Sequence, residues 1–200
     1  NLCLGLHNIY TTQGIRHIQA ILNHVWRKTD TGKLIQITLE HAKLEIGMPG
    51  SLLTLDYNIF SHLCEDTWIK HVWKFMREKG ITIKDDLGDF SMHRKHDKPI
   101  ADCFAQAFHN KLITKREWKR ANLCRKYLRV LTISDITSAN GKNVTTHIWK
   151  GIRMPTHIRQ LSWCSQGKPS SIDWGIWRRI LKLCICNKDR VLQQSLGNWL

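Results

Sequence analysis

A strongly one-sided amphipathic segment, residues 114–131, most constrains how this chain can fold. Its apolar residues recur three and four positions apart, which predicts a helix with one buried stripe formed by Trp118, Ala121, Cys124, Tyr127, Leu128 and Leu131. Thr114 followed by Glu117 is a capping box that predicts where this helix begins. Its other faces carry one acid and seven cations: Lys115, Arg116, Lys119, Arg120, Arg125, Lys126 and Arg129. We therefore expect the aromatic side to be buried and the cationic side to face an anionic partner.

The remaining patterns favour a mainly α fold with a few short β strands, arranged as small helical subdomains. Helical spacing predicts helices over residues 15–25, 33–46, 67–80 and 100–108, and a last one from Ser170 to Cys184. Residues 1–14 are expected to form a loop, and 28–32 a polar turn. Short strands are expected at 81–83 and 144–149, the second after a reversal at Asn140-Gly141.

These elements suggest two modules. Residues 1–83 are expected to form an N-terminal helical module, 84–99 a charged linker, and 100–200 a basic, tryptophan-rich helical module. The alternative that both modules form one compact unit stays open.

The charge balance is the most informative part of the composition. Thirty-one Lys and Arg against 16 Asp and Glu give a net charge of +15, while the 42% hydrophobic fraction excludes wholesale disorder. Such an excess favours contact with RNA, DNA or another polyanion; the alternative is an incidental excess or one balanced by an acidic neighbour. Beyond residue 131 the further cations include Lys142, Lys150, Arg153, Arg159, Lys168, Arg178, Arg179 and Lys182.

The cysteine pattern bears on the cellular compartment. Seven cysteines are an odd, scattered number, and with no secretory leader they predict reduced thiols in an intracellular protein, cytoplasmic or nuclear. No apolar run approaches the roughly 20 residues of a membrane span, so no membrane partner is expected. Since the chain begins at Asn1 rather than Met, we expect it to be part of a longer polypeptide.

For each candidate catalytic or metal-binding group, the sequence favours a structural interpretation over a functional one. Asp85-Asp86 is preceded by Lys84 and is followed by Gly88, which favours a solvated turn over a two-metal carboxylate pair. Neither His93 with His96 nor Cys184 with Cys186 supplies the two paired ligand sets of a structural zinc site. His62 and Cys64 have no residue to orient them as a nucleophilic pair. We therefore expect no enzyme activity, no cofactor and no metal.

Eight of the nine tryptophans divide by context into two groups. Helical spacing places five on apolar stripes, where burial in a core is expected: Trp68, Trp73, Trp118, Trp174 and Trp177. Trp149, Trp163 and Trp199 lie near glycine, proline or basic residues outside the expected helices. They could stack on unpaired bases or hold loops against the body, and the sequence leaves both interpretations open.

The run Asn122–Val130 is followed by Ser134-Asp135-Ile136 and Asn140-Gly141-Lys142. Other short motifs of the chain are Thr31–Leu34, Leu39-Glu40, Leu44–Gly47, Thr67–Ile69, Trp73–Phe75, Pro169 with Trp174 and Trp177, and Leu196–Trp199. In their order along the chain, these motifs resemble the region downstream of the reverse transcriptase in retroelement polyproteins of diatoms and other microbial eukaryotes. The chain departs from this pattern at His93–Ala101, and no catalytic residue can be transferred.

The resemblance implies a non-catalytic accessory region, thumb-like or connecting, that packs with other domains of its polyprotein and holds RNA or DNA. The expected phosphate contacts are the seven cations of residues 115–129, with Trp149 and Trp163 as stacking groups. The alternative is a structural or assembly module that packs on the polymerase or a partner protein through its tryptophans.

Overall fold

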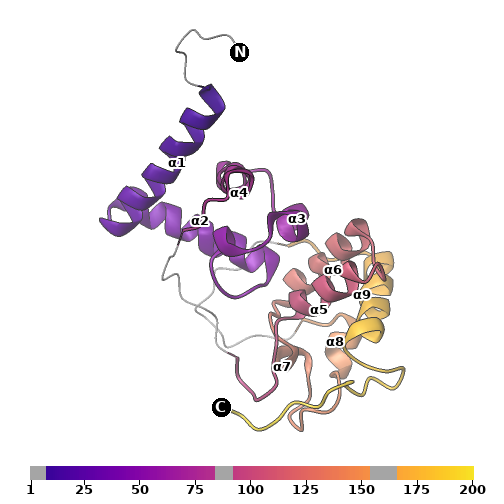
Figure 1. Ribbon diagram of the computed structural model, residues 1–200. Coiled ribbons are helices and arrows are strands. Elements are labelled where there is room, and N and C mark those ends of the chain that lie inside the picture. The colour runs from indigo at the N-terminus through magenta and orange to yellow at the C-terminus, as the bar shows by residue number, and fades with distance from the viewer. Residues whose placement is uncertain (1–7, 84–91, 154–165) are drawn as a thin grey trace. The chain divides into compact units, whose positions relative to one another are not determined.

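The computed structural model describes residues 8–83, 92–153 and 166–200, and these residues are mainly helical (Figure 1). The α-helices are α1 (Ile9–Trp26), α2 (Asp30–Ile46), α3 (Tyr57–Phe60), α4 (Trp68–Lys79), α5 (Ile100–His109), α6 (Lys115–Leu128), α7 (Ile133–Ile136), α8 (Thr146–Lys150) and α9 (Ser171–Cys184). Two short 3₁₀ helices are η1 (Leu52–Thr54) and η2 (Ser61–Leu63). In these ranges the β structure consists of isolated bridges, so the expected mainly α fold is confirmed.

The chain divides into two compact units. The first comprises the described parts of Asn1–Ala42 and Ser51–Leu87, and the second comprises Lys43–Gly50 with the described parts of Gly88–Leu200. The sequence analysis placed residues 43–50 in the first module and 92–99 in a linker, whereas the structure packs both with the second unit. The reason is tertiary: the end of α2 is held by side chains of α6, and Pro99 forms a bridge with Thr132.

In the first unit, α4 carries the core. Ile69, Val72 and Met76 on this helix are buried, and the indole N–H of the buried Trp73 donates to the Leu55 carbonyl at 2.9 Å. Trp68, which the sequence placed in the core, is instead exposed at the start of α4, where its ring meets that of His17.

Helix α1 packs against α4 at a glycine. A Cβ on Gly14 would lie 2.6 Å from ring atoms of Phe75, so the two helices can approach this closely only without a side chain there. The expected loop up to Gly14 is therefore wrong from Ile9 onward: Asn8 caps α1 by accepting from the Thr11 N–H, and Gly14 serves helix packing.

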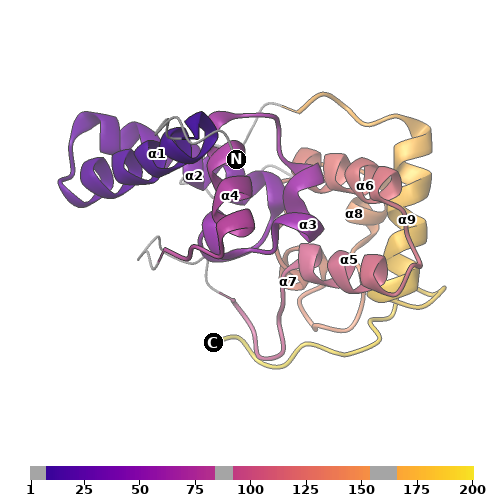
Figure 2. The same ribbon diagram turned by 45° about the horizontal axis from the view of Figure 1, so that its top comes forward.

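The core of the second unit lies between α5, α6 and α9. Figure 2 shows α5 and α6 side by side with α9 running across them. Trp118 and Trp177 are fully buried, and the rings of Phe104 and Trp177 meet edge-on with centroids 5.9 Å apart. Tyr127 and Trp174 form a similar pair between α6 and α9.

The C-terminal segment is fixed to the same unit through Arg94. Its buried guanidinium donates from Nε to the Gly197 carbonyl at 2.9 Å and lies 4.7 Å from the centre of the Trp199 ring. Backbone bonds between Lys95 and the 197–198 segment complete this attachment. Trp199 thus stacks on an arginine of its own chain.

The expected strands are wrong. In residues 144–149, only Val144 forms a bridge, with Thr137, before the chain enters α8. The helix begins where the Thr145 carbonyl accepts a hydrogen bond from the Trp149 N–H, and it ends at Gly151, which has a φ of +71°. Residues 81–83 have no bridge to any described residue. Propensity from β-branched residues is weak enough for tertiary packing to override it.

Within the part of the chain that the structure describes, no helix combines the length and apolar content that a bilayer crossing requires.

Candidate nucleic-acid interface

The two units differ sharply in charge. Sequence counts over their bounds give the second unit 22 Lys and Arg against 8 Asp and Glu, a net charge of +14. The first unit has 9 against 8, a net charge of +1. Almost the whole basic excess therefore belongs to one folded body, which creates a strong positive potential around it.

Helix α6 is built as the sequence predicted. The Thr114 hydroxyl accepts from the Glu117 N–H, and the Glu117 carboxylate accepts from the Thr114 N–H at 2.9 Å. This backbone bond, with smaller contributions from the Thr114 hydroxyl and from Arg179, lowers the pKa of Glu117. Trp118, Ala121, Cys124 and Leu128 of the predicted stripe are buried on α6, whereas Tyr127 is half-buried and the buried Leu131 lies beyond the end of the helix.

Helix α9 begins with a second capping box, between Ser170 and Asp173. The Ser170 hydroxyl and backbone N–H both donate to the Asp173 carboxylate, and these bonds lower its pKa. Trp174, Trp177, Ile180 and Leu181 form the buried stripe, as expected. Two carboxylates, Glu117 and Asp173, therefore lie where α6 and α9 meet.

Ion pairs join the two helices at this junction. Arg179 on α9 pairs with Glu117, and Arg120 on α6 lies 3.8 Å from an oxygen of Asp173. Each carboxylate is thus already engaged by its capping bonds and by an arginine. The junction leaves little free negative charge to repel an anionic ligand.

The structure separates the seven predicted phosphate contacts of α6 into different groups. Lys115, Arg116 and Lys119 are exposed, and no described carboxylate lies within ion-pair distance of them. Arg120 is half-buried against Asp173. Lys126 is only 13% exposed and lies 3.6 Å from the Glu45 carboxylate, so its expected exposure is wrong.

Arg125 is the clearest correction, because its side chain is completely buried. Nη2 donates to the carbonyls of Leu44 and Glu45 at 2.6 and 2.7 Å, and Nε donates to Asn122 Oδ1 at 2.7 Å. The guanidinium thus caps the C-terminal carbonyls of α2, where a cation is favoured by the helix dipole. It cannot contact phosphate in this conformation.

The last predicted contacts lie away from the exposed group or outside the described residues. Arg129 ends α6 in a left-handed conformation with φ +59°, roughly 20 Å along the helix axis from Lys115. Trp149 is half-buried, and the Lys182 ammonium lies 5.5 Å from the centre of its ring. Trp163 and Arg159 lie outside the described residues.

Helix α9 adds cations that the sequence analysis named but did not include among the phosphate contacts. Arg178 is half-buried, while Arg179 and Lys182 are exposed. Their spacing of one and four residues along a helix was a usable signal, and the structure adds that α9 packs against α6. We call the six residues Lys115, Arg116, Lys119, Arg178, Arg179 and Lys182 the basic surface.

The described residues offer no cluster that could hold a metal ion, and four of their cysteines are unreactive thiols. Among the described residues, no three His, Cys, Asp or Glu side chains are placed to share an ion; Asp85 and Asp86 lie outside this set. Burial raises the pKa of Cys103 and of Cys186 to about 11, and raises that of Cys124 and of Cys184 further. These thiols therefore stay protonated and poorly nucleophilic at neutral pH.

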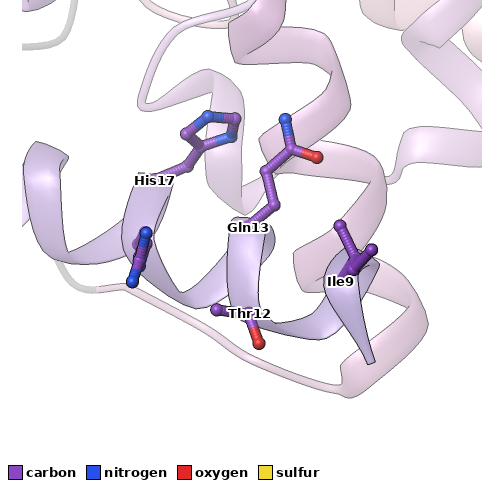
Figure 3. A pocket seen from close by; sticks show the side chains of 5 residues that line it. Ile9, Thr12, Gln13 and His17 are labelled. Carbon is purple, nitrogen blue, oxygen red and sulfur yellow. The ribbon is translucent and has the colours of Figure 1, made fainter. Parts of the chain in front are cut away.

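Two hollows beside α1 in the first unit also lack a catalytic arrangement. One is lined by Ile9, Thr12, Gln13, Arg16 and His17, all on α1, and Figure 3 shows the labelled side chains rising from this single helix. A second, of about 340 Å³, lies between α1 and α4 and is lined mostly by aromatic and apolar side chains together with His17 and His71. Among the described residues, no carboxylate lines either of these two hollows to form an acid–base pair with the histidines.

Comparison with known proteins adds no relative: the chain matches no protein-family model, no curated protein and no solved structure.

Proposed function

We propose that this chain binds RNA or DNA through the basic surface of α6 and α9, mainly by contacts to phosphate. The observation that carries the proposal is the segregation of charge: the second unit has a net charge of +14 and the first +1. Neutralising phosphates with Lys and Arg releases condensed counterions and needs no particular residue spacing. A surface of this kind therefore holds the nucleic-acid backbone without reading its sequence.

The arrangement of the cations supports the same proposal. Lys115, Arg116 and Lys119 extend into solvent from the first turns of α6, where positive side chains oppose the helix dipole. An approaching anion would relieve this unfavourable placement. The carboxylates at the junction of α6 and α9, Glu117 and Asp173, are already held by capping bonds and by Arg179 and Arg120.

We propose further that the chain is a non-catalytic accessory region, thumb-like or connecting, of an intracellular retroelement polyprotein that contains a reverse transcriptase. The support is the ordered set of motifs around Asn122–Val130, Thr67–Ile69 and Leu196–Trp199. In that role the basic surface would hold template, primer or element RNA beside the polymerase.

The binding test removes charge from the exposed α6 group. Affinity for a 25-nucleotide RNA and a 25-base-pair DNA duplex is measured by fluorescence anisotropy from 50 to 300 mM salt. The triple variant Lys115→Gln, Arg116→Gln, Lys119→Gln should lower the log–log salt slope for duplex by about 2–3, and the affinity by roughly 10- to 100-fold, if each cation contacts one phosphate. Gln is chosen because its helix propensity is close to that of Lys and Arg.

A matched triple in the first unit provides the control. Arg16→Gln, Arg27→Gln and Lys79→Gln remove the same charge from exposed positions of the near-neutral unit. This variant should leave the salt slope nearly unchanged. An equal loss in both triples would show diffuse attraction by total charge and would reject a localised surface.

The assembly alternative rests on exposed apolar groups in the first unit. Trp26 is 70% exposed and Ile37 63%, on the neighbouring helices α1 and α2. The indoles expected to mediate assembly are largely buried, however, including Trp73, Trp118 and Trp177. Light scattering of the purified chain distinguishes assembly from nucleic-acid binding, because an assembly module should form oligomers. The double variant Trp26→Gln, Ile37→Gln should then restore the monomer without changing the affinity for nucleic acid.

A further inference from the structure

Gly175 is a helix residue that the packing of the protein does not explain. It lies inside α9, is exposed, and a Cβ built on it would meet no atom within 4 Å. Glycine is one of the least favourable residues inside a helix because it loses the most backbone entropy on folding.

The two other helical glycines of the described chain have clear steric reasons. A Cβ on Gly14 in α1 would lie 2.6 Å from the Phe75 ring, and one on Gly32 in α2 would lie 2.0 Å from the His24 carbonyl oxygen. Gly175 therefore leaves open space above the α9 backbone that no described residue fills. Such a position lets a ligand approach the helix more closely than any side chain would allow.

The residues around Gly175 define the chemistry of that ligand. On a helix, positions three and four residues away are neighbours, so Ser171 and Ile172 lie on one side of Gly175 and Arg178 and Arg179 on the other. Lys182 follows one turn beyond and is exposed. In this patch the only charges on α9 itself are positive, and the carboxylate that faces it from α6, Glu117, is bound by Arg179.

The bond to Glu117 leaves donors on Arg179 for a ligand. Only Nη2 contacts the carboxylate oxygen, whereas a guanidinium carries five N–H donors in a rigid fork. The ion pair therefore fixes the guanidinium beside the open space at Gly175, which we call the glycine gap, without using all five of its N–H donors. A phosphate group has the charge and the acceptor oxygens to fit there.

We propose that the sugar–phosphate backbone of the bound nucleic acid makes its closest approach to the protein at Gly175, with Arg178, Arg179 and Lys182 as the phosphate contacts. This inference rests on the proposed function and assigns α9, rather than α6, the nearest contact. A phosphodiester backbone is the occupant that the charge of the patch favours; a helix from a second copy of this chain is the alternative that the test must exclude.

The experiment fills the gap without removing any charge. Gly175→Ala should raise Tm by about 2–4 °C, because Ala is the better helix former and nothing obstructs its methyl group. Gly175→Leu also favours helix but projects further into the gap. If the methyl group weakens one phosphate contact and the Leu side chain breaks it, affinity at 0.1 M salt should fall about threefold for Ala and about tenfold for Leu.

Gly167→Ala is the matched control. Gly167 also belongs to the second unit, has open space around its Cβ position and has no positive φ, but it precedes α9. This variant should bind as the unmodified chain does. A more stable Gly175→Ala protein with weaker binding cannot be explained by unfolding, so that pair of results would support close approach.

Three outcomes would overturn the inference. Unchanged affinity of Gly175→Leu, while the α6 triple variant loses binding, rejects the α9 contact and leaves the proposed function intact. Absence of binding by the unmodified chain rejects both. A shift from dimer to monomer in Gly175→Leu, seen by light scattering with affinity unchanged, would assign the gap to a second copy.

Discussion

Replacing Arg125 by Met should strongly destabilise the second unit, although the substitution lies within a run of surface-like basic residues. Arg125 is completely buried and donates to the carbonyls of Leu44, Glu45 and Val130 and to the Asn122 side chain. Met has a similar length and is apolar, so it fills much of the volume but cannot donate any of these bonds.

The expected loss follows from the groups left behind. A buried acceptor that loses its donor costs about 1–3 kcal/mol, and Arg125 serves four acceptors. Part of this cost is offset because a guanidinium no longer has to be desolvated, and because the Glu45 carbonyl still accepts from the Asn122 side chain at 2.7 Å. We expect a net loss of about 3–5 kcal/mol, which is a large fraction of the roughly 5–15 kcal/mol that stabilises an ordinary domain.

Urea unfolding followed by tryptophan fluorescence measures this loss. Arg125→Lys keeps the charge but not the planar fork, so its loss should be intermediate. Arg116→Met, on the exposed side of the same helix, should change stability by less than about 0.5 kcal/mol. A loss of less than about 1 kcal/mol for Arg125→Met, or weaker RNA binding at unchanged stability, would contradict a structural role for the buried guanidinium.

Two further predictions concern the contact between α1 and α4 in the first unit and the loss of stability at acidic pH. Gly14→Ala should destabilise the first unit by about 1–3 kcal/mol despite the helix propensity of Ala, because its Cβ would lie 2.6 Å from the Phe75 ring. In chemical denaturation, the double variant Gly14→Ala, Phe75→Leu should be more stable than the single variant Gly14→Ala. Hydrogen bonds from Thr114 and Ser170 lower the pKa values of Glu117 and Asp173 in the folded protein. The two carboxylates therefore stabilise the fold at pH values above their ordinary pKa values of 4.5 and 3.8, and this stabilisation is lost as the pH falls through the lower pKa values of the folded state. Tm should accordingly fall as pH drops from about 5 to 2, less steeply for Glu117→Gln, Asp173→Asn than for the unmodified chain; parallel curves would contradict this assignment.

Helices whose start and stop signals are local could be predicted from the order of their residues alone. Glu117 lies three residues after Thr114, and the bonds between them form within a single turn, so the start of α6 could be predicted without knowing any partner. The same local chemistry ends α4 at Gly80, with φ +64°. The buried stripes of α6 and α9 also follow from spacing, because residues three and four apart share one face of a helix.

Which cations face solvent depends instead on contacts between segments that are distant in the sequence. Arg125 and Arg116 look alike in the sequence, yet the carbonyls that hold Arg125 lie 80 and 81 residues earlier in the chain. The Arg120–Asp173 pair likewise depends on how α6 packs against α9. Helical periodicity assigns a side chain to one face of its helix. The burial and the partners of that side chain depend on contacts between segments that are distant in the sequence, and such contacts leave no periodic signal in either segment.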